Sequence, residues 1–265
     1  MYKKYFEANK KLWDKKTAIH ADSDFYNLKE FKEGKSSLNF VELEALGDVK
    51  DKSLLHLQCH FGMDSLSWAR LGAKVTGVDF SDEAIKLAKS LNTELKLDAE
   101  FIPSNVYDLR ENLDEKFDIV FTSYGTIGWL PDLDKWAEII SHFLKPGGVF
   151  FIAEFHPVIW MFDDEIKNLK YSYFNSGEPI AETNEGTYTD RKADIKMTEY
   201  GWNHSLDEVF NSLKNNGLKI ESFNEYPFSF HNCFPEMVKG EDNFWRIKEF
   251  EKILPLMYSI KAIKS

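Results

Sequence analysis

The sequence predicts an α/β fold built on one doubly wound, mostly parallel β-sheet. Short apolar segments alternate with amphipathic helical segments between residues 53 and 154, as they do where helices cover both faces of a parallel sheet. Residues 117–123 (FDIVFTS) are apolar on both faces, which is typical of a central strand in such a sheet. A length of 265 residues with 43% hydrophobic content suits one domain with a buried core.

The elements follow in order from local signals. A short helix is expected at residues 37–46. We expect strands at residues 53–58, 74–79, 99–103, 117–123 and 149–154, and further strand-like segments at 218–226 and 254–263. Helices are expected at residues 63–71, after the cap residue Ser81, at 132–144, and after a capping box formed by Ser205 and Glu208. Pro146, Gly147 and Gly148 predict a turn before the fifth strand.

Three segments do not fit the alternation. Residues 1–36 mix aromatic and charged side chains without clean periodicity, and we expect them to form an N-terminal cap. Residues 156–203 and 227–249 are expected to be insertions, a lid and a second insertion, within a single domain of residues 1–265. Both follow strands at the carboxyl edge of the sheet, where doubly wound sheets bind ligands.

Composition narrows the class of function. The net charge is −11 and no basic block is present, which disfavours nucleic acid or an anionic membrane as a partner. The first residues lack the apolar core of a signal peptide and no apolar run is long enough to span a bilayer, so a cytoplasmic protein is expected. Two cysteines without CxxC spacing predict neither a disulfide framework nor a metal site.

The first strand-turn-helix unit offers a candidate cofactor site. Its turn reads Gln58-Cys59-His60-Phe61-Gly62, and Asp79 ends the next strand. A carboxylate at that position can accept hydrogen bonds from both ribose hydroxyls. A pyrophosphate requires close backbone approach at several points, which side chains at Gln58 and His60 hinder. The turn therefore favours an adenosyl ligand without phosphates, such as S-adenosylmethionine, over a nicotinamide dinucleotide.

Across residues 37–155 and 204–263 the chain resembles the class I S-adenosylmethionine-dependent methyltransferases. The resemblance rests on the combination of LHLQCHFG, LSWARLGAKVTGVDFS, FDIVFTSYGTIGWLPDL and LKPGG. In a group of uncharacterised bacterial members, QCHFG replaces the common GCGxG turn. The resemblance implies a Rossmann-like seven-stranded sheet whose last strand, beginning near LPLMYSIK, is antiparallel. It also implies S-adenosyl-L-methionine as the cofactor.

The resemblance assigns roles to individual residues. Those implied at the methionine end of the cofactor are Gln58, Cys59, His60 and Gly62. Asp79 would hold the ribose, and the residues implied beside the adenine are Phe80, Asn105 and Val106. Ser123 and Tyr124 would lie near the reacting methyl group. His156 and His204 are the candidates for a general base.

Several alternatives remain open. Asp79 either binds ribose or caps a helix, His60 either contacts the cofactor or is an ordinary loop residue, and Trp129 either packs inside or edges the site. The favoured function is methyl transfer to a small-molecule acceptor by a monomer or homodimer. The rivals are a noncatalytic protein that binds S-adenosylmethionine or S-adenosylhomocysteine and a nicotinamide-dependent oxidoreductase, although the GxGxxG motif of the latter is absent.

Overall fold

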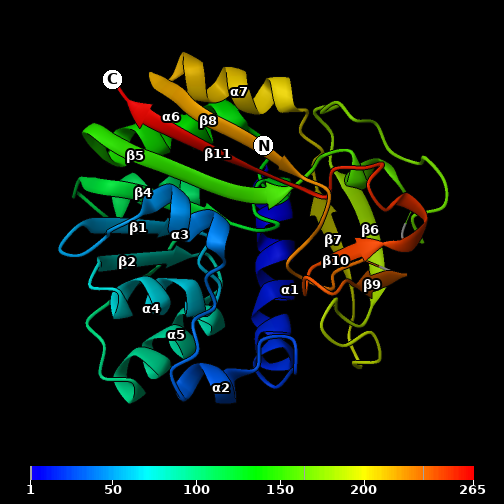
Figure 1. The fold of residues 1–265 in the computed structure, drawn as a ribbon, viewed down its shortest axis with the longest axis horizontal. Helices are drawn as coiled ribbons and strands as arrows, with labels where there is room; N and C mark the ends of the chain where they lie inside the picture. Colours follow the sequence, from blue (N-terminus) through cyan, green and yellow to red (C-terminus); the bar gives the residue numbers. More distant parts are fainter. Residues whose placement is uncertain (1, 164, 235) are drawn as a thin grey trace.

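A seven-stranded sheet forms the centre of the molecule (Figure 1). The structure is a computed structural model that describes residues 2–163, 165–234 and 236–265. The strand order is β3-β2-β1-β4-β5-β11-β8, and β11 runs antiparallel to both of its neighbours. The bounds of these strands are β1 Ser53–Leu57, β2 Lys74–Asp79, β3 Glu100–Pro103, β4 Phe117–Ser123, β5 Leu144–Phe155, β8 Leu218–Tyr226 and β11 Met257–Lys264.

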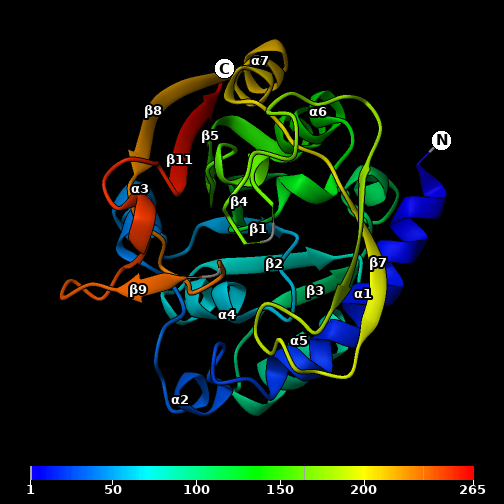
Figure 2. The same cartoon turned by 90° about the vertical axis from the view of Figure 1, so that its right-hand side faces the viewer.

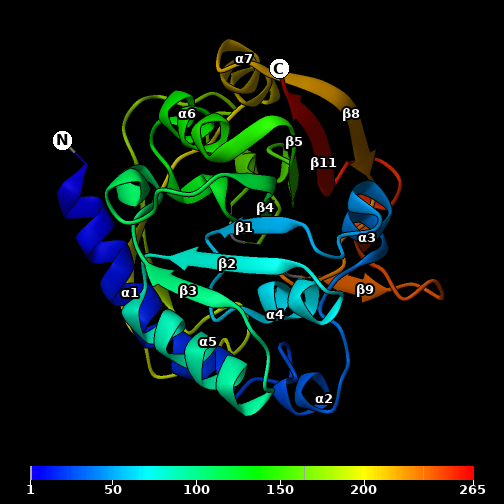
Figure 3. The same cartoon turned by 90° about the vertical axis from the view of Figure 1, so that its left-hand side faces the viewer.

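Helices cover both faces of the sheet and bury a hydrophobic cluster on each (Figure 3). The helices of one face are α3 Phe40–Leu46, α4 Met63–Arg70 and α5 Asp82–Glu94. Those of the other are α6 Leu133–Phe143 and α7 Leu206–Asn215, with the short 3₁₀ helix η1 Val106–Glu111. Two helix starts have the expected caps: Ser81 Oγ accepts a hydrogen bond from Ala84 N (3.1 Å), and Asp132 Oδ1 accepts one from Lys135 N (3.0 Å).

The predicted doubly wound sheet with one antiparallel strand is confirmed, and two local predictions are wrong. Residues 146–148 do not separate helix from strand, because β5 begins at Leu144 and passes through them with a register shift against β4. The capping box at the start of α7 is also absent. Ser205 Oγ donates to Asp207 Oδ1 (2.5 Å) instead of capping a backbone N–H, and Glu208 pairs with the ring of His204.

A roof lies over the carboxyl edge of the parallel strands. It consists of α1 Lys3–Ala21 with the loop that follows it, and a hairpin of β6 Ile180–Glu185 and β7 Lys196–Gly201. Figures 1 and 2 show α1 running beside β7. The side-chain amide of Asn9 donates to Tyr200 O (2.7 Å) and accepts from Tyr200 N (2.9 Å), as a paired strand would.

A second small hairpin, β9 Met237–Lys239 with β10 Trp245–Ile247, lies beyond β8. The short helix α2 Leu28–Lys32 follows α1 and packs Phe31 into the core beside α4 and α5. Within the described part of the chain, every helix is too short or too polar to cross a bilayer.

Candidate cofactor and acceptor site

A cavity of about 1000 Å³ lies between the sheet and the roof. Its floor is made by the turns that follow β1, β2, β3, β4 and β5, and its walls by α1, the β6–β7 hairpin and residues 230–234. This volume is at the upper end of the range for small-molecule sites, so there is room for an adenosyl cofactor together with an acceptor. All ten residues predicted to bind the cofactor line it.

The turn after β1 has a backbone that normally requires glycine. The φ angles of Gln58, His60 and Gly62 are 57°, 52° and 80°, and a left-handed conformation costs a residue with a side chain about 1–2 kcal/mol. Two contacts hold the turn: Gln58 Nε2 donates to Thr126 O (2.8 Å), and His60 N donates to Asp79 Oδ2 (2.8 Å). The backbone at Gln58, His60 and Gly62 therefore keeps the left-handed conformation of a GxGxG turn, although only Gly62 is a glycine.

Gly62 is required for packing as well as for its backbone. A Cβ atom at Gly62 would lie 2.7 Å from Cε1 of Phe101, a buried residue of β3. The missing side chain at Gly62 therefore lets helix α4 approach the sheet closely, and the neighbour that it approaches is a phenyl ring. Cys59 is buried, and burial raises the pKa of its thiol, so it remains protonated and unreactive.

Asp79 joins β2 to the turn. Its two carboxylate oxygens accept from His60 N (2.8 Å) and Ser81 N (2.9 Å), and its side chain still lines the cavity. Burial raises the pKa of Asp79 to about 6 despite these hydrogen bonds. Asp79 does not cap α5, whose N-cap is Ser81; its carboxylate orders the residues before that helix and faces the cavity, so ribose binding by Asp79 stays a prediction.

The side chains after β3 and β4 are partly engaged by the protein. Asn105 Oδ1 accepts from Tyr107 N (3.0 Å), and Val106 beside it is buried. Ser123 Oγ donates to Asp64 Oδ2 (2.9 Å), while Tyr124 Oη donates to Glu42 Oε2 (2.9 Å). An amide oxygen has two lone pairs, so Asn105 retains one for a ligand.

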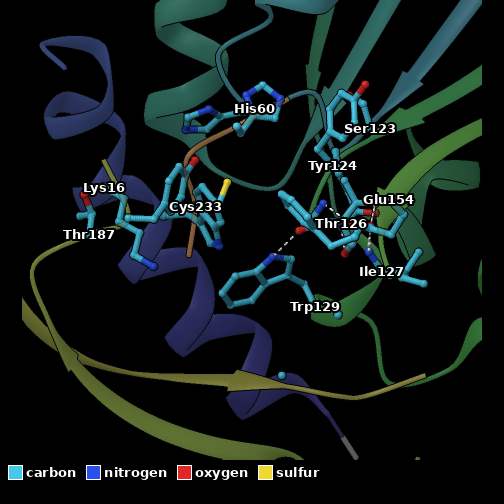
Figure 4. Close-up of a pocket in the computed structure, with 18 of the residues that line it drawn as sticks. Lys16, His60, Ser123, Tyr124, Thr126, Ile127, Trp129, Glu154, Thr187 and Cys233 are labelled. Atoms are coloured by element: carbon cyan, nitrogen blue, oxygen red, sulfur yellow. Dashed lines mark hydrogen bonds between the residues drawn. The ribbon is translucent and has the colours of Figure 1, made fainter. Parts of the chain in front are cut away.

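Glu154 at the end of β5 holds the loop after β4. This buried carboxylate accepts from Thr126 N (2.7 Å), Thr126 Oγ1 (2.9 Å) and Ile127 N (3.2 Å), and also from the backbone N–H of Gly125 (Figure 4). Trp129 Nε1 donates to Gly125 O (2.9 Å) and its ring lines the cavity. Trp129 therefore edges the site rather than packing beneath α6.

The two candidates for a general base have other contacts. His156 is not among the residues that line the cavity; its Nε2 lies 2.9 Å from Glu225 Oε1 and its Nδ1 accepts from Val158 N (3.2 Å). His204 does line the cavity; its Nε2 lies 2.7 Å from Leu130 O, whereas its Nδ1 lies 3.1 Å from Glu208 Oε2 but makes no hydrogen bond with the described residues. Both ring nitrogens of His156 bind the protein outside the cavity, so His156 is not placed to take a proton from an acceptor, whereas the role of His204 stays a prediction.

Sequence reasoning missed the contribution of α1. Trp13 and Lys16 line the cavity, and Trp13 contacts both Trp129 (5.4 Å between ring centroids) and His60 (5.2 Å). Lys16 is 7% exposed and pairs with Glu199 of β7 (2.9 Å). The sequence carried no clear signal for this, because the buried positions of α1 recur at helical spacing but are mostly polar: Asn9, Leu12, Lys16, Thr17 and His20.

Several polar atoms at the cavity are buried without a partner. Those of the described residues that line it are Gln58 Oε1, His56 Nε2, His60 Nε2, His204 Nδ1, Tyr258 Oη, Trp13 Nε1 and Trp202 Nε1. Leaving a buried polar group unpaired costs about 1–3 kcal/mol, so a cluster of such groups around a cavity is the arrangement expected where a polar ligand binds. Among the described residues, no three His, Cys, Asp or Glu side chains gather as metal ligands would.

Comparison with known proteins identifies the domain. Residues 55–152 match the family model described as a methyltransferase domain. The chain is 31% identical over 115 residues to a ubiquinone biosynthesis O-methyltransferase of Serratia proteamaculans, a match that covers 43% of this chain and 47% of that protein. The chain spans about half the length of the curated relatives it matches.

Solved structures share the fold. An S-adenosylmethionine-dependent methyltransferase of Clostridium acetobutylicum is similar with a TM-score of 0.58 and 15% identity, over 93% of this chain and 94% of that one. The geranyl diphosphate C-methyltransferase of Streptomyces coelicolor, in complex with S-adenosyl-L-homocysteine, is similar with a TM-score of 0.56 and 16% identity, over 84% and 76%. Residues 55–152 therefore match a methyltransferase domain, and the chain has the fold of solved S-adenosylmethionine-dependent methyltransferases.

Proposed function

We propose that this class I methyltransferase domain transfers the methyl group of S-adenosylmethionine to a small-molecule acceptor enclosed beneath the roof. The observation that carries the proposal is the cavity itself. It joins the turn after β1, the carboxylate of Asp79 and the end of β4 to a space beneath the roof that is large enough for two ligands. The turn has no GxGxxG motif, so side chains cover the backbone N–H groups that would bind a pyrophosphate. This disfavours the nicotinamide-dependent oxidoreductase.

The residues around the cavity suit the parts of this cofactor. Asp79 would accept hydrogen bonds from the ribose hydroxyls, as it already accepts two N–H groups at 2.8 and 2.9 Å. Phe80, Asn105 and Val106 would contact the adenine. The unpartnered Gln58 Oε1 and His60 Nε2 would meet the amino and carboxylate groups of the methionine part. The adenosyl group carries no phosphate, so the side chains of the turn do not block a close approach of the ligand to the backbone.

The chemistry suits a protein that mainly aligns its reactants. The sulfonium supplies an already activated methyl group, and the acceptor attacks it in line from the side opposite sulfur. Holding the two at a near-attack distance of about 3 Å provides most of the rate enhancement. Glu154 and Trp129 fix the loop that would border the reacting atoms, and the ring faces of Trp13 and Trp129 would favour the sulfonium charge.

We further propose that the methylated atom is oxygen. The relatives that match the domain are named O-methyltransferases. The net charge of −11 and the volume of the cavity favour a small acceptor over a nucleic acid.

Calorimetric titration separates the main alternatives. S-adenosylhomocysteine should bind and NADH should not; the reverse would refute the proposal. Turnover distinguishes an enzyme from a noncatalytic binder. S-adenosylmethionine carrying a labelled methyl group should transfer the label to hydroxyl compounds in a metabolite screen. Donor binding without transfer to any hydroxyl, thiol or amine would favour the noncatalytic alternative.

A further inference from the structure

One end of the cavity is bounded by aromatic rings from three separate segments. Phe25 and Tyr26 come from the loop after α1, Tyr188 from the β6–β7 hairpin and His231 from the second insertion, and we call these four residues the aromatic end. The ring centroids of Phe25 and His231 are 5.4 Å apart in a stacked arrangement, and those of Phe25 and Tyr188 are 5.4 Å apart. The hydroxyls of Tyr26 and Tyr188 lie 2.5 Å apart.

The aromatic end adjoins the position where the methyl group would be transferred. The ring of His231 lies 5.0 Å from that of Tyr124, which directly follows β4. Tyr26 contacts His60 of the cofactor turn, with ring centroids 5.4 Å apart. None of the four residues belongs to the set assigned to the cofactor, so this end is left for a second ligand. Its flat walls complement a planar molecule, since offset and edge-to-face ring contacts are favourable.

The charged side chains of the hairpin that line the cavity are already neutralised. Each of its three carboxylates has a cationic partner: Glu182 with Lys170 (3.5 Å), Glu185 with Lys196 (2.6 Å) and Glu199 with Lys16 (2.9 Å). Arg191, which also lines the cavity, is solvent-exposed. A charged acceptor held away from Arg191 would therefore lose its hydration without gaining a free countercharge, which is costly.

His231 has the free polar atoms at this end. Within residues 2–163, 165–234 and 236–265 no side chain or backbone group hydrogen-bonds to its ring, and burial lowers its pKa to about 4. The ring is therefore neutral under ordinary conditions and has one nitrogen able to accept a hydrogen bond. The other two polar groups of the aromatic end, the hydroxyls of Tyr26 and Tyr188, already bond to each other.

We propose that the aromatic end is the acceptor site and that it takes an uncharged aromatic hydroxyl compound whose O–H donates to the ring of His231. This inference rests on the proposed function. In the transfer, the acceptor oxygen forms a bond to the methyl carbon while the carbon–sulfur bond breaks and its electron pair returns to sulfur. The hydroxyl proton passes to the free nitrogen of His231 and from there to solvent. The products are the aryl methyl ether and S-adenosylhomocysteine.

The test uses catechol as the probe. Protein saturated with S-adenosylhomocysteine is titrated with catechol, with 1,2-dimethoxybenzene, which has no hydroxyl to donate, and with 3,4-dihydroxybenzoate, which carries a charge. Catechol should bind at least tenfold more tightly than either. His231→Phe should weaken catechol binding at least fivefold, while His231→Gln, which retains an acceptor, should restore much of it. His142→Phe, on α6 outside the cavity, serves as the matched control and should change nothing.

Turnover gives a second measurement that a structural role would not reproduce. With S-adenosylmethionine and catechol, His231→Gln should keep a KM within about threefold of the wild-type value and lose at least tenfold in kcat, because an amide cannot take the proton. Wild-type protein that binds S-adenosylhomocysteine but not catechol would overturn this inference and leave the proposed function standing. Failure to bind S-adenosylhomocysteine would overturn the proposed function. Unchanged catechol binding and kcat in both variants would remove His231 from the site.

Discussion

The affinity for S-adenosylhomocysteine should depend on pH through Asp79. Burial raises the pKa of this carboxyl to about 6 in the protein without ligand. Ribose hydroxyls bind the ionised carboxylate more strongly than the neutral acid, since hydrogen bonds to charged groups contribute about 1.5–3 kcal/mol and neutral ones about half of that. If only the ionised form binds, the apparent Kd is multiplied by one plus the ratio of protonated to ionised Asp79. The complex should therefore be about tenfold weaker at pH 5 than at pH 7.5.

Calorimetric titration at half-unit steps of pH between 5 and 7.5 measures this dependence. Asp79→Asn is the control, because it should bind about tenfold more weakly at pH 7.5 and show little further change down to pH 5. Asp79→Ala is less informative, since it also leaves the N–H groups of His60 and Ser81 without their acceptor. A wild-type Kd that stays constant from pH 7.5 to pH 5 would show that Asp79 does not hold the ribose.

Three further predictions concern the framework of the site. His60→Gly should be about 1 kcal/mol more stable than His60→Ala in urea unfolding, because only glycine adopts a φ of 52° without strain. At Lys89, in the middle of α5, the alanine variant should instead be the more stable one. If the glycine variant is the more stable one at both positions, the backbone of His60 is not strained. Glu154→Gln should lower the free energy of unfolding by roughly 2–5 kcal/mol, because the NH₂ group of the glutamine would face backbone N–H donors. The same substitution at the exposed Glu115 should have almost no effect. Equal effects of the two substitutions would refute the role given to Glu154. Burial raises the pKa of Glu42 from 4.5 to about 7, so the contribution of this carboxyl to stability is complete below pH 4.5 and is lost, by about 3 kcal/mol, as the pH rises through 7. Glu42→Gln should flatten the decline in the free energy of unfolding between pH 5 and 8. An unchanged slope would assign that decline to other groups.

The sheet could be predicted from the sequence because its strands are buried on both faces. Residues 117–123 were expected as a strand and form β4 with the same bounds. The N-terminal helix could not be recognised from apolar periodicity. Its buried face carries Asn9, Lys16, Thr17 and His20, which meet a cavity and the polar backbone of β7 instead of a core. A periodicity of hydrophobic residues does not reveal a helix whose buried face is polar.

The same limit explains the outcome for the histidines. His156 and His204 stand at the carboxyl ends of their neighbouring elements, the position from which a base would be expected to reach a substrate. Whether a ring nitrogen is free depends on what packs against it from distant parts of the chain: Glu225 is 69 residues from His156 and Leu130 is 74 residues from His204. His231 has no motif around it, and the structure alone shows that its ring lies beside Tyr124 and has no hydrogen bond to any residue that the structure describes.

The turn after β1 shows that this fold requires a conformation there rather than a composition. Glycine is common in such turns because left-handed φ angles are free of strain for it alone. Here Gln58 and His60 adopt those angles, and each has a compensating contact: the amide of Gln58 reaches Thr126 O, while His60 gives its N–H to Asp79 and packs its ring against Trp13 and the loop after α1. The side chains that make the turn unsuitable for a pyrophosphate therefore also attach the roof to the cofactor site, and a variant that restores glycine at His60 should loosen α1 while leaving the turn intact.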